Sequence, residues 1–127
     1  LSQVKNNTKL LKTLEVYFKK YIYDNNIESA YDITLSIINN VGNYTTEQLI
    51  FLKAVAISDE VLDLSMILKD EKGTFDLSSV PEDLRLKATL SFYSLYNKDE
   101  EINSKLMYLR DNSLDIELRK YLTEILE

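Results

Sequence analysis

The chain lacks the two side chains that most often carry enzymatic and metal chemistry. Its 127 residues include neither Cys nor His, which excludes thiolate nucleophiles, disulfides, imidazole acid–base catalysis and the usual zinc sites. Two acidic pairs are close in sequence: Asp59 with Asp63, and Glu100 with Glu101. Neighbouring acids on a helix are usually solvated charge, and no pocket is implied around them. We therefore expect a protein that is not an enzyme, with no catalytic residue and no cofactor.

One acidic segment imitates a calcium-binding loop. Its alternating oxygen-bearing side chains are Asp111, Ser113, Asp115 and Glu117. An EF-hand loop needs Gly at its sixth position and a bidentate Glu at its twelfth. This chain has Ile116 and Leu122 at those positions, so we expect no metal site.

The lysines are unevenly distributed along the chain. Residues 1–23 carry five lysines against Glu15 alone, a net charge of +4. Because the whole chain has a net charge of −6, residues 24–127 carry −10. These lysines are Lys5, Lys9, Lys12, Lys19 and Lys20. Because phosphate backbones and anionic lipids attract clusters of Lys and Arg, an acidic body binds neither well. We do not expect nucleic acid as a partner unless the N-terminal segment alone provides the contact.

Composition indicates one packed, helix-rich domain over residues 1–127. The chain is 45% hydrophobic and 28% charged, with two Gly and one Pro, which argues against disorder and against a turn-rich β-sandwich. No apolar run reaches membrane-spanning length. The absence of cysteine favours a reducing, intracellular compartment. Because the chain begins at Leu1 and not at Met, we expect it to be an excised domain or a processed product.

The apolar periodicity predicts helices separated by short polar breaks. Between Lys9 and Tyr23, apolar side chains recur at the i, i+3, i+4, i+7 spacing of an amphipathic helix. They are Leu10, Leu11, Leu14, Phe18, Tyr21 and Ile22. The Asp-Asn-Asn break at 24–26 offers turn formers and an N-cap, and a second helix follows over 27–38. Since neither helix can bury its apolar stripe alone, we expect the two to form a hairpin.

The same alternation continues to the C-terminus. Gly42 should end the second helix in the left-handed conformation, and Thr45 with Gln48 has the spacing of a capping box. Pro81 should open a later helix. The remaining predicted helices cover residues 45–57, 61–68, 81–95, 102–109 and 116–125, with residues 70–79 as a connector. The predicted class is all-α, with about seven helices.

The polar breaks recur at a nearly constant interval. Asp24 and Ser58 are 34 residues apart, and a shift of 34 residues places Phe18 on Leu52, while a shift of 72 places it on Leu90. Helical pairs with a fixed period bury their apolar faces by stacking on their neighbours. We therefore expect repeat units over about 11–44, 45–78 and 82–113, followed by a capping helix over 114–126.

The period and the helix–turn–helix unit resemble the tetratricopeptide repeat family. The motif slots of the first unit are taken by Leu14, Tyr17, Tyr21, Ala30 and Thr34. The chain departs from the motif where Phe18, Leu52 and Leu90 replace its small residue. The resemblance spans about residues 11–113 and implies stacked antiparallel helical hairpins in a right-handed α-solenoid. A closed helical bundle is the alternative architecture.

What the resemblance implies about binding is a concave groove lined by the first helix of each unit. The expected partner-binding residues at the family's groove positions are Lys12, Lys19, Tyr23, Leu49, Lys53 and Lys87. Lys19 and Lys53 would stand at equivalent positions, so the lysines would form a basic stripe for the carboxylates of an extended peptide. Tyr23 and Leu49 would add apolar contact. The carboxylate clamp of the family also uses Asn, which these positions lack, so that clamp is not expected.

Two functions from different classes follow from these patterns. The first is a non-enzymatic scaffold or adaptor domain whose helical groove binds a protein or peptide of acidic character. The second is a compact bundle whose basic first helix, Lys5 to Tyr23, docks on an anionic membrane or nucleic acid. The oligomeric state is not indicated by the sequence.

Overall fold

The computed structural model describes the backbone of residues 2–127 and the side chains from Thr8 onward. Within this part, the α-helices are α1 (Ser2–Tyr23), α2 (Ile27–Val41), α3 (Thr46–Ile57), α4 (Glu82–Leu95), α5 (Glu100–Asn112) and α6 (Ile116–Leu126). Between α3 and α4 lie the strands β1 (Val61–Asp63) and β2 (Thr74–Asp76) and the short 3-10 helix η1 (Leu64–Met66). The predicted all-α character is confirmed, since helices dominate this part of the chain.

The helix boundaries are fixed by the predicted capping residues. Asn26 begins α2 by accepting a hydrogen bond from Ser29 N at 3.2 Å. Thr45 and Gln48 form the predicted capping box of α3, with side-chain to main-chain distances of 3.2 and 2.8 Å. Gly42 ends α2 with a φ of 80° in the left-handed region. These local predictions are therefore confirmed.

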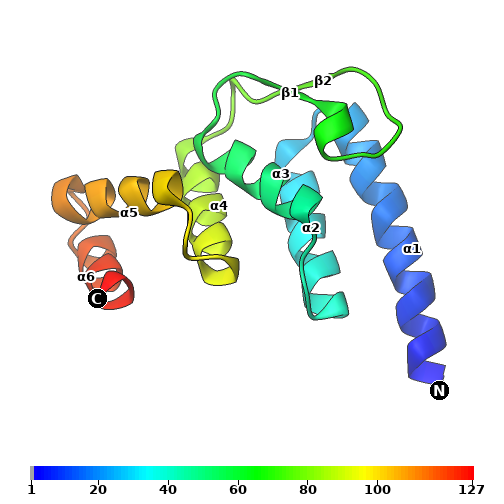
Figure 1. Ribbon diagram of the computed structural model, residues 1–127, viewed down its shortest axis with the longest axis horizontal. Helices are drawn as coiled ribbons and strands as arrows, with labels where there is room; N and C mark the ends of the chain where they lie inside the picture. Colours follow the sequence, from blue (N-terminus) through cyan, green and yellow to red (C-terminus); the bar gives the residue numbers. More distant parts are fainter. Residues whose placement is uncertain (1) are drawn as a thin grey trace.

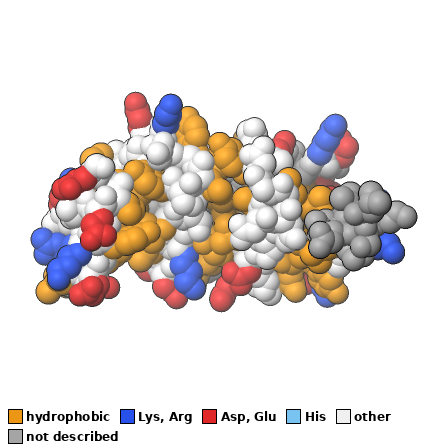
Figure 2. Space-filling view, turned by 90° about the horizontal axis from the view of Figure 1, so that it is seen from below, with side chains coloured by type: hydrophobic (Ala, Val, Ile, Leu, Met, Phe, Trp, Pro, Cys, Tyr) orange, Lys and Arg blue, Asp and Glu red, His pale blue; other side chains and the backbone are white. Residues whose placement is uncertain are grey.

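Helices that follow one another in the chain pack as pairs. The closest partners are α1 with α2, α3 with α4, and α5 with α6. Figure 1 shows the helices arranged from α1 at one end of an elongated molecule to α5 and α6 at the other, with the two termini at opposite ends. Hydrophobic side chains lie in bands between the helices on the face in Figure 2. The bulkiest fully buried aliphatic side chains are Leu52, Leu77, Ile102, Leu106 and Leu122.

The helix predicted over residues 61–68 is wrong. This segment forms β1 and η1, so the described chain has six α-helices and the predicted unit 45–78 lacks its second helix. Val61 and Met66 are 59% and 49% exposed, so the apolar residues do not line one helical face. Asp63 also accepts a hydrogen bond from Ser65 N at 3.0 Å, and such local bonds compete with helix formation.

The long connection between α3 and α4, residues 58–81, is called the strap. Its two strands pair antiparallel, with Leu62 opposite Phe75. Phe75 and Leu77 are fully buried, and their neighbours in the strand are exposed, the alternation expected of a half-buried strand. The ring of Phe75 lies 6.1 Å from that of Phe51 in α3. The strap is therefore anchored in the core of the α3–α4 pair.

The strap also reaches the first helical pair. In Figure 1 it passes over one end of the helices, and η1 lies beside the C-terminal end of α1. Asn25, in the turn between α1 and α2, accepts from Asp76 N at 3.2 Å and donates to Asp76 O at 3.4 Å. This reciprocal contact joins the turn of the first pair to strand β2.

Candidate partner-binding groove on helix α1

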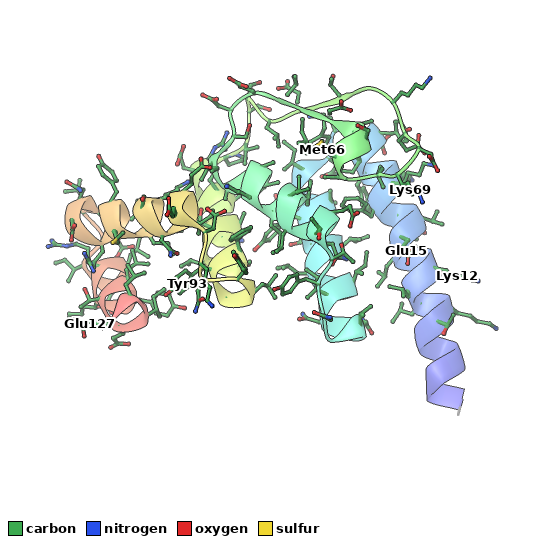
Figure 3. The ribbon with its side chains drawn as sticks, in the orientation of Figure 1. Lys12, Glu15, Met66, Lys69, Tyr93 and Glu127 are labelled. Atoms are coloured by element: carbon green, nitrogen blue, oxygen red, sulfur yellow. The ribbon has the colours of Figure 1, made fainter. Side chains whose placement is uncertain are left out.

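A shallow cavity lies between α1 and the strap. Its volume is about 430 Å³, and it is lined by Lys12, Glu15, Val16, Lys19 and Leu68. We call these five residues and the cavity between them the α1 groove. Figure 3 shows Lys12 and Glu15 on α1, and Met66 and Lys69 on the part of the strap beside that helix. The lining therefore combines the apolar Val16 and Leu68 with three charged side chains.

Helical geometry places four of the lining residues on one stripe. Lys12, Glu15, Val16 and Lys19 follow the i, i+3, i+4, i+7 spacing of a single helix face. All four are exposed, and Val16 is 68% exposed. The opposite stripe of α1, which includes Phe18 and Ile22, packs into the core. Helix α1 thus packs the C-terminal part of the predicted apolar stripe against the core, while Leu10 at its start is 43% exposed. It presents a mixed apolar and basic stripe outward.

One carboxylate of the strap is held by two side chains of α1. Lys19 Nζ forms an ion pair with Glu71 Oε1, and Tyr23 OH donates a hydrogen bond to Glu71 Oε2. Lys19 and Tyr23 are one helical turn apart, so their side chains lie on the same face. Two residues of the predicted binding set therefore meet, and their common partner belongs to this chain.

This contact shifts the pKa values of Glu71, Lys19 and Tyr23. Hydrogen bonds from Lys19 and Tyr23 lower the pKa of Glu71 below its ordinary value. The hydrogen bond to Glu71 raises the pKa of Lys19 and is the largest cause of the raised pKa of Tyr23. The ionised carboxylate is thus favoured by both partners, as expected where donors converge on an anion.

Lys53, another residue of the predicted binding set, forms ion pairs with the start of α5. Its Nζ lies 2.9 Å from Asp99 Oδ2 and 2.9 Å from Glu101 Oε1 at the start of α5, and the bond to Asp99 is the main cause of its raised pKa. Burial alone would raise the pKa of Asp99, but bonds from Lys53 and from Ile102 N outweigh it and lower that pKa. Lys53 therefore joins α3 to α5 and does not extend a stripe with Lys19.

The predicted residues Leu49 and Lys87 also lie outside the α1 groove. Leu49 is half-buried and packs against the hydrophobic core. Lys87 is exposed on α4 and does not line the groove. Of the six residues predicted to bind a partner, Lys12 and Lys19 line the groove, and Tyr23 lies one turn beyond Lys19 on the same face of α1, where it contacts Glu71. Their neighbours Val16 and Leu68 were not predicted, although exposed apolar residues on a basic helix stripe are a usable signal.

A second, polar cleft contains cations that the sequence interpretation missed. It has a volume of about 470 Å³ and is lined in part by Glu82, Arg85 and Lys105. Arg85 is 8% exposed and donates to Leu77 O in the strap at 2.9 Å. Its place on the buried stripe of α4 with Ala88 could have identified it. This arginine has main-chain carbonyls as its recorded partners, which indicates a structural role.

A third cavity lies on the terminal helical pair. It measures about 820 Å³ and is lined by Arg110, Asp111, Ile116, Arg119, Lys120, Thr123, Glu124 and Glu127. Charged side chains of both signs crowd this end of the molecule in Figure 2. Arg110 is paired with Asp111 at 3.1 Å, and the cationic and anionic lining residues are equal in number. The cavity therefore has no net charge that selects a ligand.

None of the described helices is both long and apolar enough to cross a lipid bilayer. Comparisons of the chain with family models, with curated proteins and with solved structures gave no match.

Proposed function

We propose that this chain is a non-enzymatic protein-interaction domain that binds a peptide or helix of a partner protein in the α1 groove. The observation that carries the proposal is the exposed Val16 side chain, which lies between Lys12 and Lys19 on the outward stripe of α1. An apolar side chain framed by lysines favours a ligand that supplies both an apolar contact and a negative charge.

The chemistry of the groove defines the expected ligand. An apolar side chain of the partner would lie on Val16 and Leu68, and its carboxylates would lie near Lys12 and Lys19. The carboxylate of Glu15 in the lining disfavours a ligand that is acidic throughout. We therefore propose an amphipathic acidic peptide, which buries a few apolar residues and presents carboxylates beside them.

The proposed architecture is a stack of helical pairs similar to tetratricopeptide repeats. The pairing of consecutive helices and the elongated shape in Figure 1 support it. In this proposal the strap is an insertion between the two helices of the second pair, and α5 with α6 forms the third pair. The right-handed stacking and the intracellular compartment are part of the proposal.

A binding titration with two matched variants tests the function. The probe is a fluorescein-labelled peptide that repeats the unit Leu-Glu-Glu-Leu, followed by fluorescence anisotropy. Val16→Gln should weaken binding by about fivefold, since loss of roughly 1 kcal/mol of apolar contact has that effect. Val41→Gln, at an exposed valine outside the groove, should bind as the unmodified protein does. Equal binding by the two variants would contradict the proposal.

A further inference from the structure

The strap presents to α1 the same two kinds of group that the proposed partner would bring. Leu68 lines the α1 groove with Val16, and three residues later Glu71 binds Lys19 and Tyr23. An apolar residue followed by a carboxylate is therefore already seated against the helix. The arrangement is intramolecular, because both groups belong to the described chain.

The contact with Glu71 has the form of a carboxylate-binding site. Each carboxylate oxygen has its own donor: Lys19 for Oε1 and Tyr23 for Oε2. One donor is a cation and the other a neutral hydroxyl, so the pair supplies charge and direction together. Both donors project from one rigid helix, which holds them in place whether or not the strap is bound.

The part of the strap that carries Glu71 is not the part that holds the strap in place. The anchors are the buried Phe75 and Leu77, the Arg85 bond to Leu77 O and the contact of Asn25 with Asp76. Before Glu71 the strap is held by Leu64 and Ile67, which are also buried in the core. The anchors therefore lie on both sides of Glu71, and none of them is Glu71 itself.

The segment around Glu71 is a surface turn. Its neighbours Lys69, Asp70, Lys72 and Gly73 are exposed. Asp70 and Gly73 have φ values of 67° and 114°, in the left-handed region, as is typical of tight turns. Exposed turns of this kind open locally without global unfolding. Glu71 can therefore leave α1 while the anchored strand β2 stays in place.

We infer that Glu71 is an internal stand-in for the partner's carboxylate, and that the partner must displace it from Lys19 and Tyr23 to bind. This inference rests on the proposed function and names its regulation. The partner's carboxylate replaces the carboxylate of Glu71 at the same donors. The net gain in free energy on binding then comes from the apolar contact with Val16. The partner must bind strongly enough to outcompete Glu71 for Lys19 and Tyr23.

The expected consequence is a weaker apparent affinity in the unmodified protein. A site that is occupied internally for roughly nine-tenths of the time binds its ligand about tenfold more weakly than a vacant one. Glu71→Gln removes the negative charge of the stand-in and should therefore strengthen binding of the Leu-Glu-Glu-Leu probe, by about five- to tenfold. Asp70→Asn is the matched control, because it removes one charge from the same turn and Asn tolerates a positive φ.

Two measurements test the inference. The first is the anisotropy titration with the unmodified protein, Glu71→Gln, Asp70→Asn and the double variant Lys19→Gln/Glu71→Gln. The second is amide hydrogen exchange of residues 69–73 without peptide, which should accelerate in Glu71→Gln and stay unchanged in Asp70→Asn. The double variant should lose the gain in affinity.

The outcomes separate the two proposals. If the unmodified protein binds the probe through Val16 but Glu71→Gln binds no more tightly, the stand-in role is overturned and the groove function stands. If none of the four proteins binds the probe, the groove function and the inference fall together. If binding tightens equally in Asp70→Asn, the effect is one of general charge, and the inference is again overturned.

Discussion

Arg85 and Lys105 converge on the same end of α3 from two different helices. Arg85 Nη1 donates to Val55 O at 3.2 Å and to Ser58 O at 2.7 Å, and Lys105 Nζ donates to Ala56 O at 2.7 Å. The C-terminal end of a helix carries free carbonyls and partial negative charge. The two cations therefore satisfy this end of α3 and join it to α4 and α5.

Replacing Arg85 by methionine should destabilise the fold by about 2–4 kcal/mol, because main-chain carbonyls lose charged donors. Lys87→Met is the matched control on the same helix: Lys87 is exposed, and its replacement should change the free energy of unfolding by less than about 0.5 kcal/mol. Urea unfolding followed by circular dichroism measures both. Equal effects of the two substitutions would show that the carbonyl contacts of Arg85 contribute nothing.

Lys105 should make stability depend on alkaline pH in a direction opposite to an ordinary ion-paired lysine. Burial lowers its pKa below 10.5 by more than the attraction of Glu82 raises it. Between that lowered pKa and 10.5 the unfolded chain binds more protons than the folded one, so this group makes stability rise with pH. Relative to Lys105→Met, the unmodified protein should therefore gain stability as the pH rises through that lowered pKa toward 10.5.

The comparison with Lys105→Met needs a control for other titrating groups. Lys120 is exposed and lies on α6, so Lys120→Met removes one lysine without removing the buried one. Its unfolding free energy, measured by urea at each pH, should stay parallel to that of the unmodified protein. A Lys105→Met curve that is also parallel would contradict the lowered pKa.

The features of the fold that could be predicted from sequence are those with local causes. Asn26, Gly42 and Thr45 act on their own helix ends, so short-range chemistry was sufficient to find them. The first part of the strap was mispredicted as a helix over residues 61–68, because strand β1 depends on its pairing with β2. Phe75 is placed by the ring of Phe51, and the alternation from Thr74 to Ser78 was the one local sign of a strand.

The residues of the candidate site also fall into those placed by local sequence and those placed by distant contacts. Lys12, Lys19 and Tyr23 share a face of α1 because helical periodicity puts them there. Glu71 could not be assigned to that face, since its position depends on how the strap folds across the molecule. For Lys53 the local pattern was misleading. The 34-residue period makes it equivalent to Lys19, but its ion pairs with Asp99 and Glu101 place it between α3 and α5.

Removing the Phe75 side chain should cost about 3–5 kcal/mol of stability, the usual cost of Phe→Ala at a fully buried site. Phe75 is 0% exposed and packs on Phe51. Val61→Ala on the partner strand is the control, because Val61 is 59% exposed and should lose less than about 0.5 kcal/mol. Thermal and urea unfolding report both values. A small effect of Phe75→Ala would mean that the strap is not anchored in the core.

Lowering the pH should release Glu71 of the strap from Lys19 and Tyr23 of α1. The pKa of Glu71 is lowered by Lys19 and Tyr23, so the folded contact binds fewer protons than the free side chain. Its contribution is therefore present above the ordinary pKa of 4.5 and is lost as pH falls through the lowered value. Amide chemical shifts of residues 68–72 followed by NMR should titrate below pH 4.5 and should lose this titration in Glu71→Gln.

The basic N-terminal helix offers a rival function, and its own lysines provide the test. The side chain of Lys5 lies outside the described residues, while Lys9, Lys12, Lys19 and Lys20 are exposed on α1. Lys19 is already paired with Glu71. Surface charges are screened beyond about 8 Å at physiological salt, and the rest of the chain is acidic. We therefore expect no binding to phosphatidylserine vesicles or duplex DNA in physiological salt, measured by cosedimentation and by anisotropy.

A variant with those four exposed lysines of α1 changed to Gln separates the two functions. Vesicle or DNA binding that disappears in this variant would favour the rival. Peptide binding that survives in it would exclude a role for these lysines in peptide binding.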